Sequence, residues 1–223
     1  MLVPEVFCPN KARLGTVQDG GKWVCSPNLL KSDGKECAIY ALGLNDEISF
    51  EVAIQEFTES RCVLRGIDVR DNSLETIETL NQNNGVFLKA FVGTKESMEN
   101  NPFVEQSLQN NPKGTVLEAL TLQQIMKHFG DTSIEILKMD IEGGEVDIAD
   151  EIFSLSPCQV LMEVHLLNAY KIYKFLQRFS RHGYFLFETE ANPLRLDMRE
   201  YNFIHANCLA KYGVDIVLGK YLS

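Results

Sequence analysis

Short apolar runs alternate with amphipathic segments along most of this 223-residue chain, and this alternation constrains the fold more than any other feature. Strands are predicted at residues 37–42, 62–68, 86–92, 134–140 and 159–165. Because helical patterns separate these strands, we expect an α/β fold with a doubly wound, mainly parallel sheet. Two closing strands, near residues 184–188 and 202–209, have no long helix between them. They predict an antiparallel ribbon, and so an antiparallel edge strand.

Length and composition limit the class of protein. With 223 residues and 45% hydrophobic residues, the chain suits one domain with a sizeable core. We expect residues 1–35, rich in Gly, Pro, Lys and Asp, to form an irregular amino-terminal segment that packs on a domain at 36–223. The net charge of −10 argues against a general nucleic-acid binder, because such proteins need a basic surface.

The sequence shows no targeting segment. Apolar runs fall short of the roughly 18 residues that suggest a membrane span, and the first residues lack the basic start of a signal peptide. Localisation stays open: the cytoplasm is the default expectation, and the secretory pathway is the alternative if this chain is part of a longer one.

Six cysteines lie far apart without a Cys-x-x-Cys pair, so a zinc site is not expected. Cys37, Cys62 and Cys158 each open a predicted buried strand, where we expect free thiols that pack as small apolar groups. Cys8 and Cys25 flank a polar segment and could pair in an oxidising compartment. The even number of cysteines leaves that alternative open.

An acidic turn containing glycines follows the predicted strand at residues 134–140 and carries Asp140, Glu142 and Glu145. In an open α/β sheet, ligands bind at the carboxyl ends of the strands. Three crowded carboxylates are costly unless they orient a substrate, hold a cation or accept a proton. The structural alternative is a polar turn that leads into a helix, with Glu145 at the helix N-terminus.

The first two strands end on residues that suit a nucleotide-like ligand. Gly43 allows a ligand to approach the backbone, and Asp68 stands where an acid accepts hydrogen bonds from ribose hydroxyls. No GxGxxG pattern is present. Asp46 and Glu47 would repel a pyrophosphate but would attract a positively charged cofactor. These residues favour S-adenosylmethionine over NAD.

Four blocks of this sequence, in the same order, resemble the FkbM-type methyltransferase family, and the similarity is greatest to its animal methyltransferase-like branch. The blocks are residues 19–25, 37–51, 137–145 and 162–165. The most specific is Lys-x-Asp-x-Glu-Gly-x-Glu at residues 138–145. The resemblance implies a class I, Rossmann-like methyltransferase fold with seven strands. It also implies methylation of hydroxyl groups on sugars or small molecules with S-adenosylmethionine.

The resemblance also assigns residues to the cofactor site. It places Gly43 and Asp46 on the cofactor loop, Asp68 at the ribose, and Asp140 on the acidic turn beside the cofactor. The chain departs from the family after the second strand, where the usual acid and Pro are replaced by Asp68-Val69-Arg70. The block at residues 19–25 suggests the hypothesis that the amino-terminal segment covers the cofactor.

Methyl transfer to an alcohol is an in-line attack that needs alignment and a proton acceptor or a metal. We expect Asp140 to orient the substrate or the methionine end of the cofactor, and Glu142 to act as a base or cation ligand. His165, two residues after Glu163 on one strand face, is the candidate general base. Two of these residues have structural alternatives: Asp140 as an acid that caps a helix, and His165 as a histidine bonded to a neighbouring loop. No metal ligand is assigned, because no metal pattern is present, although these carboxylates would suit Mg²⁺ or Ca²⁺.

The sequence therefore predicts a methyltransferase that uses S-adenosylmethionine to O-methylate a sugar or small metabolite. Two alternatives stay open: an inactive S-adenosylmethionine-binding module and a nicotinamide-dependent oxidoreductase. Asp140, Glu142 and His165 together favour an enzyme, and the missing glycines disfavour NAD. The expected partner is a small-molecule or glycan hydroxyl, bound by the amino-terminal segment, residues 95–114 and the loops after His165 and Phe187.

Overall fold

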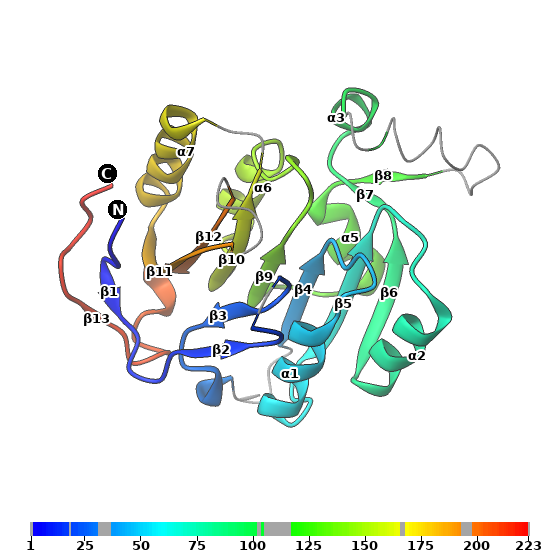
Figure 1. The fold of residues 1–223 in the computed structure, drawn as a ribbon, viewed down its shortest axis with the longest axis horizontal. Helices are drawn as coiled ribbons and strands as arrows, with labels where there is room; N and C mark the ends of the chain where they lie inside the picture. Colours follow the sequence, from blue (N-terminus) through cyan, green and yellow to red (C-terminus); the bar gives the residue numbers. More distant parts are fainter. Residues whose placement is uncertain are drawn as a thin grey trace.

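The computed structural model describes residues 2–17, 19–30, 37–101, 104, 117–165, 168–192 and 198–222. A seven-stranded sheet in the order β11-β12-β10-β9-β4-β5-β6 forms its centre (Figure 1). Its strands are β4 (Ala38–Leu42), β5 (Val63–Asp68), β6 (Gly85–Lys89), β9 (Ile136–Met139), β10 (Gln159–Val164), β11 (Tyr184–Ala191) and β12 (Arg199–His205). The strands from β10 to β6 run parallel, which confirms the predicted doubly wound sheet.

The last two strands form the predicted antiparallel ribbon at one edge. The antiparallel strand is β12, and it lies between β10 and the edge strand β11. At the opposite end of the sheet, the predicted strand at residues 86–92 is divided. β6 ends at Lys89, and β7 (Phe91–Val92) pairs with β8 (Ala119–Leu120). Residues 95–114, which were expected to help bind the acceptor, begin with α3 (Lys95–Glu99), and most of the remainder lies outside the described residues.

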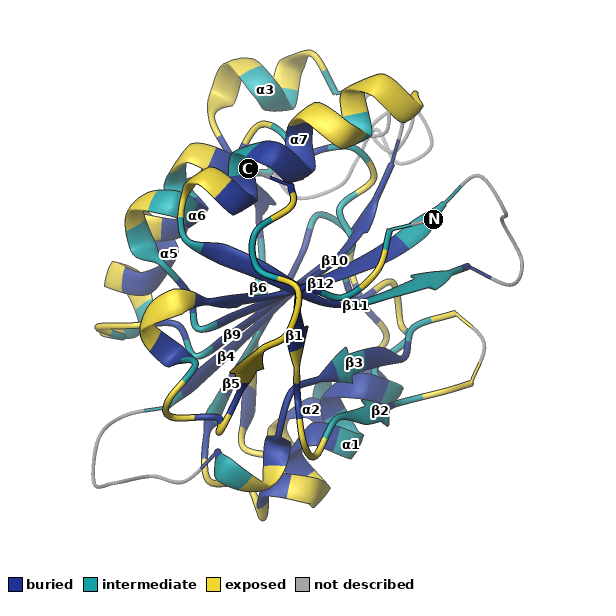
Figure 2. Ribbon diagram, turned by 90° about the vertical axis from the view of Figure 1, so that its left-hand side faces the viewer, coloured by how far each residue is buried: buried dark blue, intermediate teal, exposed yellow. Residues whose placement is uncertain are grey.

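Helices cover both faces of the sheet (Figure 2). One face carries α5 (Leu122–Phe129), α6 (Ala149–Leu155) and α7 (Ala169–Arg181), and the other carries α1 (Ser49–Thr58) and α2 (Leu74–Gln82). Within β4, Ile39 and Ala41 pack in one apolar cluster, while Tyr40 and Leu42 pack in the other. This division follows from the strand period of two. Among the described residues, no helix has the length and apolar character needed to cross a membrane.

The amino-terminal segment was predicted to be irregular, but its described residues include three short strands and a short 3-10 helix. β1 (Val6–Phe7) pairs with β13 (Asp215–Ile216), and β2 (Ala12–Leu14) pairs with β3 (Lys22–Val24), after which η1 (Pro27–Leu29) follows. The β2–β3 hairpin is anchored to β11, because Glu190 accepts hydrogen bonds from Trp23 at 3.0 Å and Arg13 at 2.9 Å. The segment therefore packs on the core with a defined geometry.

Three disulfide bonds join the six cysteines: Cys8–Cys25, Cys37–Cys62 and Cys158–Cys208. The prediction of free thiols at Cys37, Cys62 and Cys158 is therefore wrong, and the alternative for Cys8 and Cys25 is the one observed. The physical reason is strand pairing. β4 and β5 pair from their first residues, so the cysteines that precede both strands lie opposite each other, with Cα atoms 4.6 Å apart.

Candidate active site

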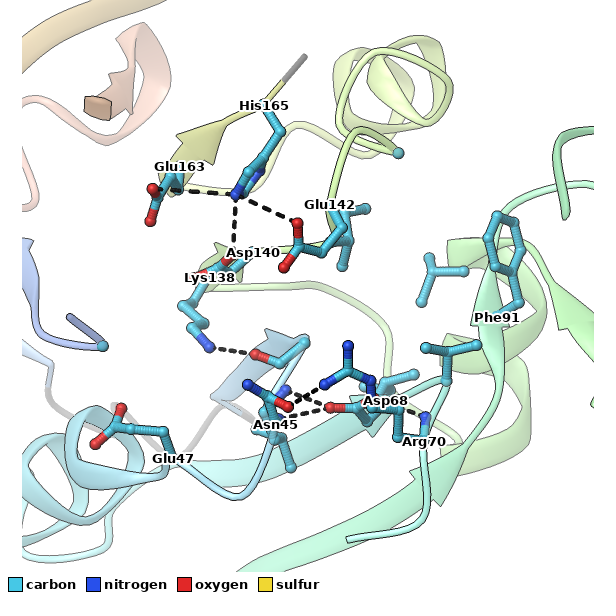
Figure 3. A pocket seen from close by; sticks show the side chains of 18 of the residues that line it. Asn45, Glu47, Asp68, Arg70, Phe91, Lys138, Asp140, Glu142, Glu163 and His165 are labelled. Atoms are coloured by element: carbon cyan, nitrogen blue, oxygen red, sulfur yellow. Dashed lines mark hydrogen bonds and ion pairs between the residues drawn. The ribbon is translucent and has the colours of Figure 1, made fainter. Parts of the chain in front are cut away.

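A cavity of about 350 Å³ opens at the carboxyl ends of β4, β5, β9 and β10 (Figure 3). This is the edge where open α/β sheets bind ligands, and the volume falls in the range of small-molecule sites. Five of the six residues selected from the sequence line the cavity: Gly43, Asp68, Asp140, Glu142 and His165. They come from four different strand ends, and the parallel sheet brings them together.

Gly43 and Asp68 shape the loop after β4. Gly43 has a φ of 78°, and a Cβ there would lie 1.8 Å from the carbonyl oxygen of Asp140. Only glycine therefore fits between the two strand ends. Asp68 Oδ2 accepts hydrogen bonds from the amides of Leu44 at 2.8 Å and Asn45 at 2.7 Å. The acid predicted for the ribose thus also holds the loop in place.

Asp46 lies on the same loop but does not line the cavity. Its Oδ1 accepts a hydrogen bond from the amide of Ser73 at 2.7 Å, at the start of α2. That backbone hydrogen bond lowers the pKa of the Asp46 carboxyl group. The next residue, Glu47, lines the cavity instead. The structure therefore does not bring Asp46 together with the other candidates.

Glu145 does not stabilise a helix N-terminus, and that expectation was wrong. Residues 142–148 form turns, and α6 (Ala149–Leu155) begins only after them. The Glu145 side chain is fully buried beneath the turn, where it accepts hydrogen bonds from the amides of Ile141 at 3.2 Å and Gly143 at 3.1 Å. Its Oε1 also lies 2.9 Å from Nδ1 of His165. Glu145 therefore links the acidic turn to the end of β10.

His165 is surrounded by carboxylates (Figure 3). Its Nε2 lies 3.6 Å from Oδ1 of Asp140 and 4.0 Å from both Glu142 Oε2 and Glu163 Oε1. Burial alone would lower the pKa of His165, but the hydrogen bond and charge of Glu145, with the charges of Asp140 and Glu142, raise it to about 9. The site therefore stabilises positive charge at this ring.

Lys22, which sequence reasoning missed, enters the site from β3. Its side chain is fully buried, forms an ion pair with Glu200 and lies 3.7 Å from Oδ2 of Asp140. Burial alone would lower the pKa of Lys22, but Glu200 and Asp140 together raise it. Burial raises the pKa of Glu200 to about 7, against the opposing charge of Lys22. The only sequence signal was the position of Lys22 within the block at residues 19–25.

Lys138, the first residue of the Lys-x-Asp-x-Glu-Gly-x-Glu block, joins two strand ends. Its Nζ donates a hydrogen bond to the carbonyl oxygen of Gly43 at 2.6 Å and lies 3.6 Å from Oε1 of Glu51. Burial raises the pKa of Glu51, although the charge of Lys138 opposes this shift. Lys138 therefore holds the β4 loop beside Asp140 and has a positioning role.

Comparison with known proteins gives a family match that covers most of the chain. The family model described as "Methyltransferase domain" matches residues 1–205. A search of curated proteins gives no match.

Two solved structures show limited similarity to the chain. A precorrin-6y C5,15-methyltransferase from Geobacter metallireducens GS-15 is 10% identical, with a TM-score of 0.46 over 81% of this chain and 85% of that chain. A methyltransferase from Geobacter sulfurreducens is 12% identical, with a TM-score of 0.33 over 76% and 70% of the two chains. Both TM-scores are below 0.5, so the family of this chain is established by the family match alone.

Proposed function

The chain belongs to the methyltransferase-domain family, and from this premise we propose that it methylates a hydroxyl group of a sugar or small metabolite. It is an S-adenosylmethionine-dependent methyltransferase. The family match favours this activity over the nicotinamide-dependent oxidoreductase considered from the sequence. The hydroxyl acceptor, and the finer kinship with the animal branch of the FkbM type, are supported by the block at residues 138–145.

The observed cavity fits this cofactor. Its acidic residues Glu47, Asp140 and Glu142 suit a sulfonium cation, while Phe91 and Val92 offer an apolar surface to a purine ring. Asp68, at the end of β5, has the position in which an acid accepts hydrogen bonds from a ribose. We assign Gly43 and Asp68 to the nucleoside and Asp140 to the reacting end of the cofactor. The contribution of Asp46 is indirect, through its hydrogen bond to Ser73.

The single observation that carries the proposed reaction is the position of Glu142 beside Asp140 and His165. The Glu142 side chain lines the cavity and is 50% exposed, whereas that of His165 is only 4% exposed. The group that takes the proton has to contact the hydroxyl that becomes methylated. We therefore assign proton acceptance to Glu142 and an orienting role to Asp140 and His165, which differs from the base role expected for His165.

When bound, S-adenosylmethionine supplies an electrophilic methyl group on its sulfonium sulfur. The oxygen of a bound hydroxyl would take this methyl group as the carbon–sulfur bond breaks, with the bonding electrons left on sulfur, so the residues of the site have to hold the hydroxyl in line and accept its proton. The hydroxyl proton passes to a carboxylate oxygen of Glu142. Asp140, between His165 and Lys22, keeps a fixed negative charge beside the reacting atoms.

Calorimetric titration tests the cofactor assignment. S-adenosylmethionine is titrated into wild type, Asp68→Asn and the control Asp71→Asn, whose exposed carboxylate pairs with Lys89. NAD is the parallel titrant. We expect wild type and the control to bind S-adenosylmethionine equally, and Asp68→Asn to bind about tenfold more weakly because a charged acceptor is lost. Absence of binding, or preference for NAD, would overturn the assignment.

Transfer of a labelled methyl group to a panel of sugars, hydroxylated metabolites, amines and carboxylic acids tests the acceptor class. We expect labelled ethers and a loss of at least about 100-fold in turnover in Glu142→Gln, with cofactor affinity retained. Methylation confined to amines or carboxylic acids would contradict the hydroxyl acceptor. Full turnover in Glu142→Gln would contradict the assigned base.

A further inference from the structure

Three side chains of two chemical types converge at the carboxyl ends of β9 and β10. Asp140 follows β9, Glu163 belongs to β10, and His165 follows β10 (Figure 3). One donor atom from each lies within 4.8 Å of the other two. These three residues do not form a single motif in the sequence, because they belong to the ends of two strands that become neighbours only in the sheet.

The separations are those of atoms that share a cation. Nε2 of His165 lies 3.6 Å from Oδ1 of Asp140 and 4.0 Å from Oε1 of Glu163, too far for hydrogen bonds. With metal–ligand distances of about 2.1 Å, two ligand atoms lie about 3.0 Å apart at right angles and about 4.2 Å apart on opposite sides. One ion between the three groups can therefore reach all of them with small side-chain adjustments.

The buried imidazole points to a ligand independently of the carboxylates. The His165 side chain is 96% buried, and among the described residues its Nε2 has no hydrogen-bond partner, while Nδ1 is paired with Glu145. Glu145 is in turn fixed by the amides of Ile141 and Gly143. Metal-binding histidines have this arrangement, in which one ring nitrogen donates to a carboxylate and the other faces the ion.

Lys22 and His165 approach different oxygens of Asp140. Lys22 lies beside Oδ2 of Asp140 and pairs with Glu200, whereas Oδ1 of Asp140 faces His165. Asn192 holds the Glu163 side chain in place, because its side-chain amide donates a hydrogen bond to Oε1 of Glu163 at 3.0 Å. Glu142 adds a further carboxylate 4.0 Å from the imidazole. The carboxylates on this side thus outnumber the nearby cations, which favours an additional positive charge.

From this geometry we propose that Asp140, Glu163 and His165 bind one divalent transition-metal ion of the Mn²⁺ or Zn²⁺ type. A mixed set of imidazole and carboxylate donors suits these ions better than Mg²⁺, which prefers oxygen ligands. Its role rests on the proposed function: the ion binds the acceptor hydroxyl and lowers its pKa, so that Glu142 takes the proton more readily. The binding site itself does not depend on that role.

The test is titration of Mn²⁺ into the chelator-treated 223-residue protein, monitored by the electron paramagnetic resonance signal of free Mn²⁺. We expect one saturable site in wild type and in the control His128→Ala, which removes an exposed histidine of α5. His165→Ala and Glu163→Gln should each weaken binding at least about tenfold, and Glu145→Gln about 10- to 100-fold. Circular dichroism shows whether each variant is folded. If His165→Ala does not fold, the nearly isosteric Glu163→Gln variant carries the test.

Absence of saturable binding of both Mn²⁺ and Zn²⁺ at millimolar concentration, or unchanged binding in folded Glu163→Gln, would overturn the site. Full turnover in the presence of a chelator would overturn the catalytic role. Titration of S-adenosylmethionine into the same metal-free protein separates the two proposals. Cofactor binding without metal binding would remove only the metal site, and metal binding without cofactor binding would remove only the assigned function.

Discussion

The buried carboxylate of Glu145 fixes the ring of His165, with Oε1 of Glu145 2.9 Å from Nδ1 of the imidazole. Both Glu145 oxygens also accept backbone hydrogen bonds from the acidic turn. In Glu145→Gln, the amide NH₂ group must face one of these donors, so either the turn or the ring loses its partner. We expect turnover about 10- to 100-fold lower, with cofactor affinity within about threefold of wild type.

Steady-state methyl transfer and calorimetry measure the two effects of Glu145→Gln. Asp147→Asn, an exposed acid two residues further along the chain, is the matched control and should behave as wild type. Unchanged turnover in Glu145→Gln would show that the Glu145–His165 pair does not position the site.

Asp46 is expected to contribute to stability and not to cofactor binding. Its Oδ1 accepts a hydrogen bond from the amide of Ser73, the N-cap of α2. Asp46→Ala removes this acceptor, and we expect the free energy of unfolding to fall by about 1 kcal/mol. Urea denaturation measures the loss, and titration of S-adenosylmethionine should give an affinity within about twofold of wild type. A tenfold weaker affinity would restore Asp46 to the cofactor site.

Local sequence patterns predict the elements that depend on neighbouring residues. Apolar periodicity marks α7 at residues 169–181, the capping box of Thr121 and Gln124 marks the start of α5, and Gly130, with a φ of 77°, caps its end. Parallel strands also bring Gly43 and Asp140 to one edge without further information. These features follow from periodicity, caps and the geometry of parallel strands.

Features that depend on contacts between distant segments were not predictable in the same way. The Cys37–Cys62 bond needs the pairing of β4 with β5, and the position of Lys22 needs the hairpin to pack against β10 and β12. Glu145 was placed at a helix N-terminus because the turn at residues 142–148, which separates β9 from α6, was not predicted. In each case the residues whose contacts determine the structure are far away in sequence or belong to an irregular segment.

The three disulfides should contribute substantially to stability. They close segments of 17, 25 and 50 residues, and loop-closure entropy assigns about 3–4 kcal/mol to each. Since such bonds persist in oxidising compartments, we expect protein made there to fold better than protein made in a reducing cytosol. Thiol titration of the denatured, unreduced protein should find no free thiol, and reduction should lower the melting temperature.

Six titratable thiols in denatured protein from an oxidising host would contradict the disulfide prediction. Cys37→Ser with Cys62→Ser tests one bond alone. The expected loss of about 3.5 kcal/mol is measured by urea denaturation without reductant. Wild type under reducing conditions is the control, and there the difference between the two proteins should largely disappear.

Acid should weaken the interaction of Asp131 with Arg65. Arg65 donates two hydrogen bonds of 2.8 Å to this carboxylate, and Tyr40 donates a third of 2.7 Å. Burial alone would raise the pKa of Asp131, but these hydrogen bonds and the charge of Arg65 lower it. The stabilisation is therefore fully present above the unfolded-state pKa of about 3.8 and is lost as the pH falls through the lower folded-state pKa.

We therefore expect the free energy of unfolding at pH 7 to be about 3 kcal/mol lower in Asp131→Asn than in wild type, because the substitution removes the charged carboxylate that accepts two hydrogen bonds from Arg65. This difference should shrink below about pH 3.8, because Asp131 of the unfolded wild type takes up a proton there, whereas the folded protein keeps the carboxylate charged until its lower folded-state pKa. Urea denaturation at pH 7, 5 and 3 measures it. Asp150→Asn, from the exposed pair with Arg178, should change stability by less than about 1 kcal/mol at each pH. A constant difference between wild type and Asp131→Asn from pH 7 to pH 3 would show that the charge of Asp131 does not contribute to stability.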